Sequence, residues 1–258
     1  MTTPSPLPIH AGVARIEPLE NPVIISDLHL SDKNPALLMG FMKFLETVAP
    51  RYKELIILGD FFDFWVGDDA MAQAQPIIAQ LQYYTSLGHR LYIMQGNRDV
   101  MLGEDFARAC GGTLIQDPIK VNIKGRDILL SHGDAWCLLD KRYQHFRAMV
   151  RNPLWQQAAL SKSVQERIRM ASQARQQSEE TKTVKSAARM DVVESAVHEA
   201  ARQYGVDVVI HGHTHKPAAH VAGAIERYVV PNWELTPTQQ MSGYITFLDG
   251  GRPQIQKF

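Results

Sequence analysis

Five short segments of the sequence carry side chains of the types that bind metal ions. Each segment alone has an ordinary explanation, because an aspartate can cap a helix and an asparagine can occupy a left-handed turn. It is their occurrence together in one chain that indicates a shared chemical role. The segments are Asp27-Leu28-His29, Gly59-Asp60, Gly96-Asn97-Arg98-Asp99, His132-Gly133-Asp134 and Gly212-His213-Thr214-His215.

The side chains in these segments indicate a site for two metal ions. Carboxylate, amide and imidazole ligands without a thiolate favour Mn²⁺ or Fe²⁺ over structural zinc. Two divalent cations about 3.5 to 4 Å apart need a shared carboxylate, and Asp60 is the candidate for that place. We therefore predict two Mn²⁺ ions as cofactors, with Fe²⁺ or another divalent metal as the alternative. The predicted ligands are Asp27, His29, Asp60, Asn97, His132, His213 and His215.

Such a pair of metals is typical of enzymes that cleave phosphate esters or anhydrides. A bound water loses a proton near neutral pH, and the resulting hydroxide attacks phosphorus in line with the leaving group. Arg98 can offset the charge that grows on the nonbridging oxygens, because a guanidinium matches phosphate oxygens two at a time. We predict catalytic roles for Asp60, Asn97, Arg98 and His213 in this hydrolysis.

Strand patterns precede each of the five segments. Short aliphatic or β-branched runs cover residues 23–26, 55–58, 91–94, 128–131 and 207–210, and helical patterns cover 35–49 and 72–87. This alternation predicts an α/β fold. In layered α/β folds, ligands bind beyond the carboxyl ends of the strands, on loops that a rigid sheet holds in place. Five segments that are distant in sequence can therefore meet at one point.

A long helical interval separates the fourth segment from the fifth. Residues 135–206 contain almost no strand pattern, and we predict helices at 143–151, 154–160, 164–177 and 190–204. We interpret about 138–204 as an inserted helical cap. Strand patterns return at 227–230 and 244–248. The predicted organisation is a flexible amino-terminal extension at 1–22, followed by one domain at 23–258 that contains the cap.

Charge is balanced over the whole chain but not within the predicted cap. The formal net charge is zero, so we expect no strong attraction to nucleic acid. Between Lys141 and Met190, however, 11 Lys and Arg stand against 3 Glu, a balance of +8. This excess is explained either by a solvated helical surface or by a surface for an anionic ligand or for membrane headgroups. Cys110 and Cys137 are expected to be reduced, buried thiols.

The ordered segments resemble the pattern of the calcineurin-like metallophosphoesterase superfamily, which here spans residues 27 to 215. The resemblance implies a four-layer α/β fold, a double β-sandwich flanked by helices. It also implies that one metal is held by Asp27, His29, Asp60 and His215. The other metal would be held by Asp60, Asn97, His132 and His213, so that Asp60 belongs to both.

Arg98 departs from the pattern of many members, which have histidine after the Gly-Asn pair. A guanidinium does not donate a proton at neutral pH, so we expect catalysis to depend on charge. A phosphate of a pyrophosphate is already a good leaving group and needs little protonation. The departure therefore favours an anhydride substrate.

Further motifs are similar to those of the UDP-2,3-diacylglucosamine hydrolase family of lipid A biosynthesis, from about Val23 to the carboxyl end. They are the segment 61–69, Gly96-Asn97-Arg98-Asp99, His132-Gly133-Asp134, Tyr143-Gln144 with Phe146-Arg147, and Met190-Asp191-Val192. The resemblance implies water attack on the α-phosphorus of the UDP group, which gives UMP and 2,3-diacylglucosamine 1-phosphate (lipid X), with Mn²⁺ as the usual metal. It also implies that the cap holds the acyl chains.

The same resemblance implies a set of substrate contacts. They fall on Asn97, Arg98, Asp140, Ser178, Lys185 and His213, and also on Lys182, where the family commonly has asparagine. A lysine there alters the polar contact to the sugar or nucleotide, although it could still meet an anionic phosphate.

The expected partners are a lipid-linked nucleotide and an anionic membrane surface, with no nucleic acid and no obligate protein partner. We expect a cytoplasmic protein that is peripheral on the cytoplasmic face of the inner membrane, because we find no signal peptide or spanning segment. One alternative is a metallophosphoesterase that acts on soluble nucleotides or dinucleoside polyphosphates. Another is a noncatalytic protein-binding scaffold, but such proteins normally lack part of the ligand set.

Overall fold

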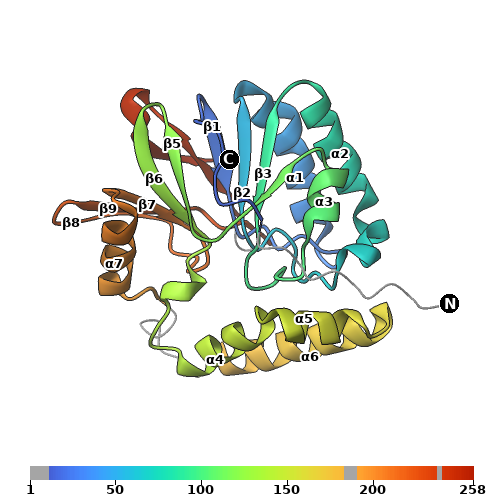
Figure 1. Cartoon of the computed structure of the whole chain (residues 1–258). Coiled ribbons are helices and arrows are strands. Elements are labelled where there is room, and N and C mark those ends of the chain that lie inside the picture. The colour runs from blue at the N-terminus through green and yellow to red at the C-terminus, as the bar shows by residue number, and fades with distance from the viewer. Residues whose placement is uncertain (1–11, 183–190, 237–239) are drawn as a thin grey trace.

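Two β-sheets form the centre of the protein in a computed structural model (Figure 1). The structure describes residues 12–182, 191–236 and 240–258, without the side chains of 177–182. The six-stranded sheet has the order β13-β12-β1-β2-β3-β4, and the five-stranded sheet has the order β5-β6-β7-β9-β8. Their bounds are β1 Pro22–Ile25, β2 Glu54–Leu58, β3 Arg90–Met94, β4 Thr113–Ile115, β12 Gly243–Phe247 and β13 Pro253–Lys257, then β5 Ile119–Ile123, β6 Arg126–Ser131, β7 Val208–His211, β8 Ala219–Ala222 and β9 Ile225–Val229.

The side chains of each strand alternate between its two faces and so form two separate hydrophobic cores. Side chains point alternately to opposite faces of a strand, and parallel pairing places Ile24 beside Ile56, and Ile56 beside Tyr92. These residues face the second sheet and pack with Ile128 and Ile210 between the two sheets. The intervening residues of the same strands face the opposite way and pack against helices. The strands are therefore apolar on both faces.

Helices cover the outer face of each sheet, which gives four layers (Figure 1). The six-stranded sheet is covered by α1 Pro35–Thr47, α2 Gln75–Ser86 and α3 Glu104–Ala109, and the five-stranded sheet by α7 Glu194–Tyr204. Helix α1 begins where Asn34 accepts a hydrogen bond from the Leu37 amide, and α7 ends at Gly205 in a left-handed conformation. The predicted four-layer α/β fold is confirmed.

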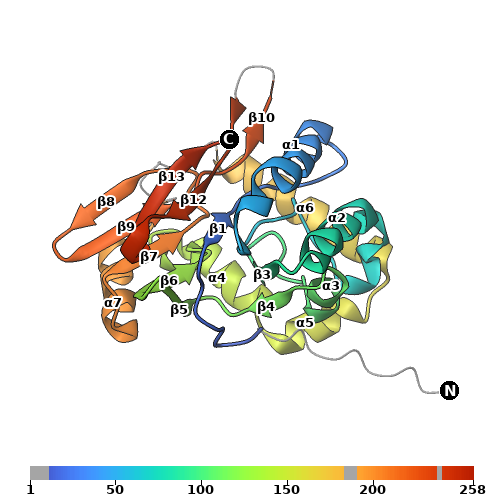
Figure 2. The same cartoon turned by 90° about the horizontal axis from the view of Figure 1, so that it is seen from above.

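Three further helices form a layer across the ends of the strands (Figures 1 and 2). They are α4 Lys141–Val150, α5 Pro153–Leu160 and α6 Val164–Lys182. Asp140 caps α4 by accepting a hydrogen bond of 3.2 Å from the Tyr143 amide. Asn152 caps α5, whose first residue is Pro153. We call these three helices the cap.

Helix α7 lies apart from the cap, although the predicted cap interval of 138–204 includes it. Its apolar residues Val197 and Ala201 pack against Leu129 and Val209 of the five-stranded sheet. The helical pattern is the same for a cap helix and for a helix that covers a sheet, so the sequence does not separate the two cases.

Several elements differ from the sequence prediction. Short strands β4, β5, β8 and β13 and the short helix α3 were not predicted, and neither was the pair β10 Glu234–Leu235 and β11 Gln240–Met241. Cys110 and Cys137 are buried thiols outside any disulfide bond of the described residues, which confirms that prediction. Among the described residues, no helix is both long enough and apolar enough to cross a membrane. Residues 1–11 of the predicted extension lie outside the described range.

Candidate metal centre

The five segments with candidate ligands meet at the carboxyl ends of β1, β2, β3, β6 and β7. Backbone hydrogen bonds join their loops directly. The Asp27 amide donates to the Gly59 carbonyl at 3.1 Å, and the His29 amide donates to the Asp60 carbonyl at 3.0 Å. The Gly212 amide donates to the His132 carbonyl at 3.0 Å. The first loop is therefore joined to the second, and the fourth loop to the fifth.

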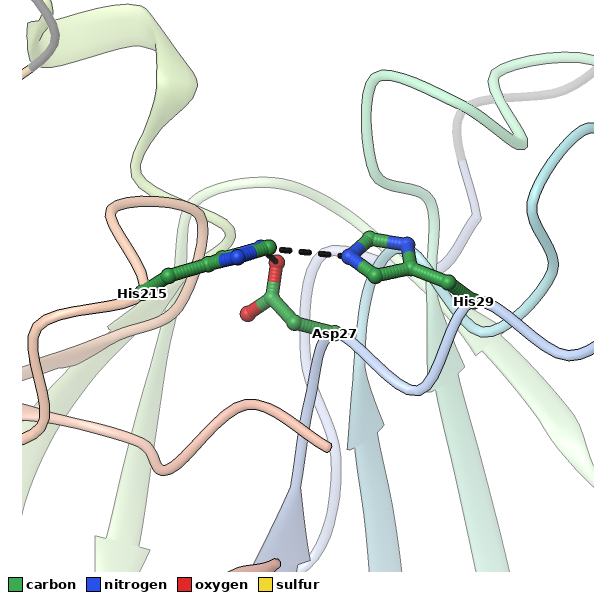
Figure 3. Close-up of side chains that lie close together, drawn as sticks. All are labelled: Asp27, His29 and His215. Carbon is green, nitrogen blue, oxygen red and sulfur yellow. Dashed lines mark hydrogen bonds and ion pairs between the residues drawn. The ribbon is translucent and has the colours of Figure 1, made fainter. Parts of the chain in front are cut away.

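A first group of side chains consists of Asp27, His29 and His215, which point toward one another (Figure 3). The Nε2 atoms of His29 and His215 are 3.1 Å apart. Asp27 Oδ1 lies 3.3 Å from Nε2 of His215. One oxygen and two nitrogens thus converge on a single point, as ligands of one cation do.

A second group lies on the other side of Asp60. Its Oδ1 atom is 3.5 Å from Nε2 of His132, and the same Nε2 is 3.0 Å from Oδ1 of Asn97. The second oxygen of Asp60, Oδ2, is 3.8 Å from Nδ1 of His29. One oxygen of this buried carboxylate therefore lies beside His132 and the other beside the His29 ring, so Asp60 stands between the two groups.

His213 lies next to the second group. Among the described residues, ligand atoms converge in two clusters, Asp27 with His29 and His215, and Asp27 with Asp60 and His132, and neither cluster includes His213. Its ring centre is 5.2 Å from that of His132, and its backbone amide donates to Asp27 Oδ2 at 2.9 Å. The structure thus brings all the predicted metal ligands into one region, with His213 at its margin.

Most of these residues adopt backbone conformations that are rare for residues other than glycine. The φ angles are 55° for Asp27, 52° for His29, 51° for Asp60, 66° for His213 and 54° for His215. Left-handed conformations of this kind cost about 1 to 3 kcal/mol each and concentrate at functional sites. Because several candidate ligands share this conformation, we infer that the loops adopt it in order to bring the ligand side chains together.

Glycines allow the loops to approach closely. A Cβ atom on Gly96 would lie 2.2 Å from Asp60 Oδ1 and from the Asp60 amide nitrogen. Gly59 has a φ of 84°, and a Cβ there would lie 2.6 Å from Nδ1 of His132. The close approach of the loops therefore explains why glycine precedes Asp60 and Asn97.

The charges and unpaired atoms of the site fit divalent cations. Asp27 Oδ1 and His29 Nδ1 are buried with no hydrogen-bond partner among the described residues. Burial opposes a charge on His132, but nearby carboxylates, Asp60 first, raise its pKa to about 9. This raised pKa reflects the negative charge gathered in the site, which also favours a bound cation. Burial, followed by the charge of Arg98, holds the pKa of His29 well below its ordinary value, and neutral imidazole is the form that binds metals.

Two cations fit these residues. Asp27, His29 and His215 would hold one, and His132 with Asn97 and His213 the other, with Asp60 in common. When bound, such ions acidify a water molecule and offset charge on a phosphoryl group.

Arg98 lies beside the shared carboxylate. Its amide donates to Asp60 Oδ1 at 2.9 Å, and its Nε is 3.4 Å from Asp60 Oδ2. Its Nη1 donates to Asp63 Oδ1 at 2.6 Å. The guanidinium is mostly buried, with 11% of the side chain exposed, so it is positioned against the site and does not extend into solvent.

Two buried aspartates hold the loops of the site. Asp99 accepts hydrogen bonds from the amides of Gly96 and Phe61, each at 2.7 Å, and so joins the third loop to the second. Asp134 accepts hydrogen bonds from Tyr143 and from Nε of Arg147, both on α4. Asp99 and Asp134 thus fix the loops that carry the candidate ligands and join them to the cap.

The predicted substrate contacts are only partly described. Asn97, Arg98 and His213 lie in the site, and Asp140 lies at the start of α4. The side chains of Ser178 and Lys182, and all of Lys185, lie outside the described residues.

Sequence reasoning missed Asp63 and two arginines of the cap region. Arg151 Nη2 contacts the Gly96 carbonyl at 3.3 Å, and Arg175 Nη2 lies 3.1 Å from Asp63 Oδ1. The charge excess between Lys141 and Met190 was the available signal, but it does not say which residues face inward.

A cavity of about 220 Å³, lined mainly by apolar side chains, lies between the core and the cap, next to the site. Leu30, Phe62 and Trp65 line it from the core, and Ile168 lines it from α6. Asp63 is also part of its lining, so the cavity adjoins the residues that hold Arg98.

Comparison with known proteins places this geometry in context. The model of the calcineurin-like phosphoesterase family matches residues 22–217. The chain is 42% identical over 224 residues to a UDP-2,3-diacylglucosamine hydrolase of Bordetella pertussis, covering 84% of this chain and 87% of that protein. Proteins of the same name from Chromobacterium violaceum and Chromohalobacter salexigens are 44% and 42% identical, covering 88% and 77% of this chain and 94% and 81% of those proteins.

Proposed function

The chain belongs to the calcineurin-like phosphoesterase family and, within it, to the UDP-2,3-diacylglucosamine hydrolases, and we propose that it hydrolyses the pyrophosphate bond of UDP-2,3-diacylglucosamine. The products would be UMP and 2,3-diacylglucosamine 1-phosphate, as in lipid A biosynthesis. The observation that supports this reaction best is the buried Asp60 carboxylate, which lies between His132 on one side and His29 on the other.

The residues around Asp60 suit attack at the α-phosphorus. Arg98 would bind nonbridging phosphoryl oxygens, since its guanidinium is fixed at the edge of the site. Asn97 and His213 would help to orient the phosphoryl group. We propose Mn²⁺ for both positions, with Fe²⁺ as the alternative, because the ligands are carboxylate, amide and imidazole. No proton donor is assigned to the leaving group, which is itself a phosphate.

The cap supplies a place for the acyl chains. The cavity lined by Leu30, Phe62, Trp65 and Ile168 adjoins the site and is closed partly by α6. A hydrolase of soluble nucleotides has no need of such a cavity. We propose that Asp140, Ser178, Lys182 and Lys185 contact the polar part of the substrate, and that the cap comprises α4, α5 and α6.

An assay with purified protein, Mn²⁺ and UDP-2,3-diacylglucosamine tests this function. We expect release of UMP that stops when the metal is chelated. The matched control replaces the lipid substrate with UDP-N-acetylglucosamine or a dinucleoside polyphosphate, which we expect to be turned over at least about 100-fold less efficiently because they lack acyl chains. Efficient turnover of the soluble nucleotides without UMP release from the lipid would favour the alternative function.

We further propose that the cap docks on the cytoplasmic face of the inner membrane, as a lipid-linked substrate requires. Leu139 and Leu154 are 54% and 75% exposed, and Phe146 and Met149 are also exposed. Exposed basic residues also occur in the cap: Lys141 and Arg142 on α4, Lys162 between α5 and α6, and Arg169 on α6. Exposed apolar side chains and cations in one layer of helices match the interface of an anionic bilayer.

Flotation with anionic vesicles tests membrane docking. We expect binding that weakens with salt and that falls by about tenfold in the Leu139→Asp/Leu154→Asp variant, because two exposed apolar anchors are lost. Val221→Asp is the matched control, since Val221 is 76% exposed but lies on β8, away from the cap. Equal binding by all three proteins, or binding that ignores both lipid charge and salt, would rule out this docking.

A further inference from the structure

Arg98 is held by more than one element, and Asp63 is central to that arrangement. The Arg98 amide donates to Asp60, and its carbonyl accepts a hydrogen bond of 3.2 Å from the Trp65 amide. Its side chain then donates to Asp63 at 2.6 Å. A guanidinium has five N–H donors, so Arg98 can bind Asp63 and a phosphoryl oxygen at the same time.

The backbone of Asp63 is itself fixed. Its amide donates to the Leu30 carbonyl at 3.0 Å, and Leu30 pairs with Phe62 in an isolated bridge. Phe62 is buried and stacks on Trp65, with ring centres 4.6 Å apart. Among the described residues, neither cluster of candidate metal ligands includes Asp63. Its carboxylate therefore has a rigid base and a role separate from metal binding.

A second arginine, from the cap, contacts the same carboxylate oxygen. Arg175 of α6 places Nη2 at 3.1 Å from Asp63 Oδ1, the atom that accepts from Arg98. Three and seven residues after Arg175 come the predicted substrate contacts Ser178 and Lys182. The Asp63 carboxylate, in the loop after β2, therefore forms ion pairs with both Arg98 and cap helix α6.

We propose that Asp63 is a positioning residue that sets the orientation of Arg98 toward the phosphoryl group and links that orientation to the seating of α6 through Arg175. This deepens the proposed function, because it assigns a determinant of the same reaction. A displaced Arg98 would lose its stabilisation of charge in the transition state, and an error of about 1 Å in such a group can cost about 100-fold in rate. Asp63→Asn keeps the volume but removes the charge that both arginines share.

A double-mutant cycle tests whether Asp63 acts through Arg98. We expect Asp63→Asn to lower kcat by about 10- to 100-fold with little change in KM, and Arg98→Ala to lower it further. In the Arg98→Ala background, Asp63→Asn should have almost no additional effect, since the residue that it positions is absent. Multiplicative effects of the two substitutions, or normal kcat in Asp63→Asn, would overturn the proposal.

Asp69→Asn is the matched control for the link to the cap. Asp69 forms a similar ion pair with Arg167 of α6, with Oδ1 2.8 Å from Nη1, but no contact of Asp69 with Arg98 occurs in the described part of the chain. Arg98→Ala should lower kcat by the same factor with or without Asp69→Asn. Metal content, measured by elemental analysis, should match the parent protein in Asp63→Asn; a loss of bound metal would contradict a purely positioning role.

The cycle is run in parallel with a chromogenic phosphodiester, bis(4-nitrophenyl) phosphate, so that it does not depend on the natural substrate. If UDP-2,3-diacylglucosamine is not cleaved but the diester is, the proposed function fails while the role of Asp63 is still measured. If Asp63→Asn unfolds, Arg175→Ala replaces it in the cycle, and additive behaviour with Arg98→Ala then counts against the link to α6.

Discussion

Replacing Asp60 with alanine is expected to lower kcat by on the order of 10³-fold or more, the largest effect that we predict for a single substitution. The reason lies in the position of its two oxygens. Oδ1 lies 3.5 Å from His132 Nε2 and Oδ2 lies 3.8 Å from His29 Nδ1, so the variant loses a carboxylate that stands between the two groups. We expect the bound metal, measured by elemental analysis, to fall together with the release of UMP.

The control for this experiment is Asp105→Ala. Asp105 is an exposed aspartate at the start of α3 whose carboxylate pairs with Arg108 on the surface. This substitution should leave metal content and kcat close to those of the parent. Circular dichroism and thermal unfolding separate loss of ligand from loss of fold, and Asp60→Asn gives a variant of equal volume. A folded Asp60→Ala variant with full metal content and normal turnover would refute the shared-ligand assignment.

The features that the sequence predicted well are those that local pattern determines. Runs such as 55–58 are apolar at every position because β2 is covered on one face by helices and on the other by the second sheet. Polar residues such as Asp60 and His132 follow such runs directly, and the parallel pairing of neighbouring strands brings their carboxyl ends to one edge. The position of the candidate ligands follows from these two facts.

Other features depend on tertiary contacts that no local pattern encodes. The cap and α7 share a helical pattern, but only the packing of Val197 on the second sheet separates them. The left-handed conformations of His29 and His215 reflect convergence of loops 186 residues apart. Likewise, Asp63 is one of several acidic residues in the segment 61–69. Its ion pairs with Arg98 and Arg175 depend on three elements that are distant in sequence and adjacent in the fold.

Replacing Arg98 with alanine is expected to lower kcat by about 10² to 10³-fold while metal content stays unchanged. Arg98 is not one of the candidate metal ligands, and its Nε lies 3.4 Å from Asp60 Oδ2, so its loss removes positive charge from the site without removing a ligand atom. Arg98→Lys keeps the charge but lacks the planar fork, and we expect it to recover only part of the rate.

The dependence of this defect on pH distinguishes charge stabilisation from proton donation. A guanidinium remains protonated throughout the range in which enzymes of this kind are assayed, so the ratio of parent to Arg98→Ala rates should be constant between about pH 6 and 9. Arg98→His would place an imidazole where many related enzymes have one, and its rate should gain a titration that the parent lacks. If the Arg98→Ala defect instead vanished at high pH, a group that titrates in this range, and not the fixed charge of Arg98, would account for the defect, and the preference for an anhydride substrate that we derive from Arg98 would lose its physical basis.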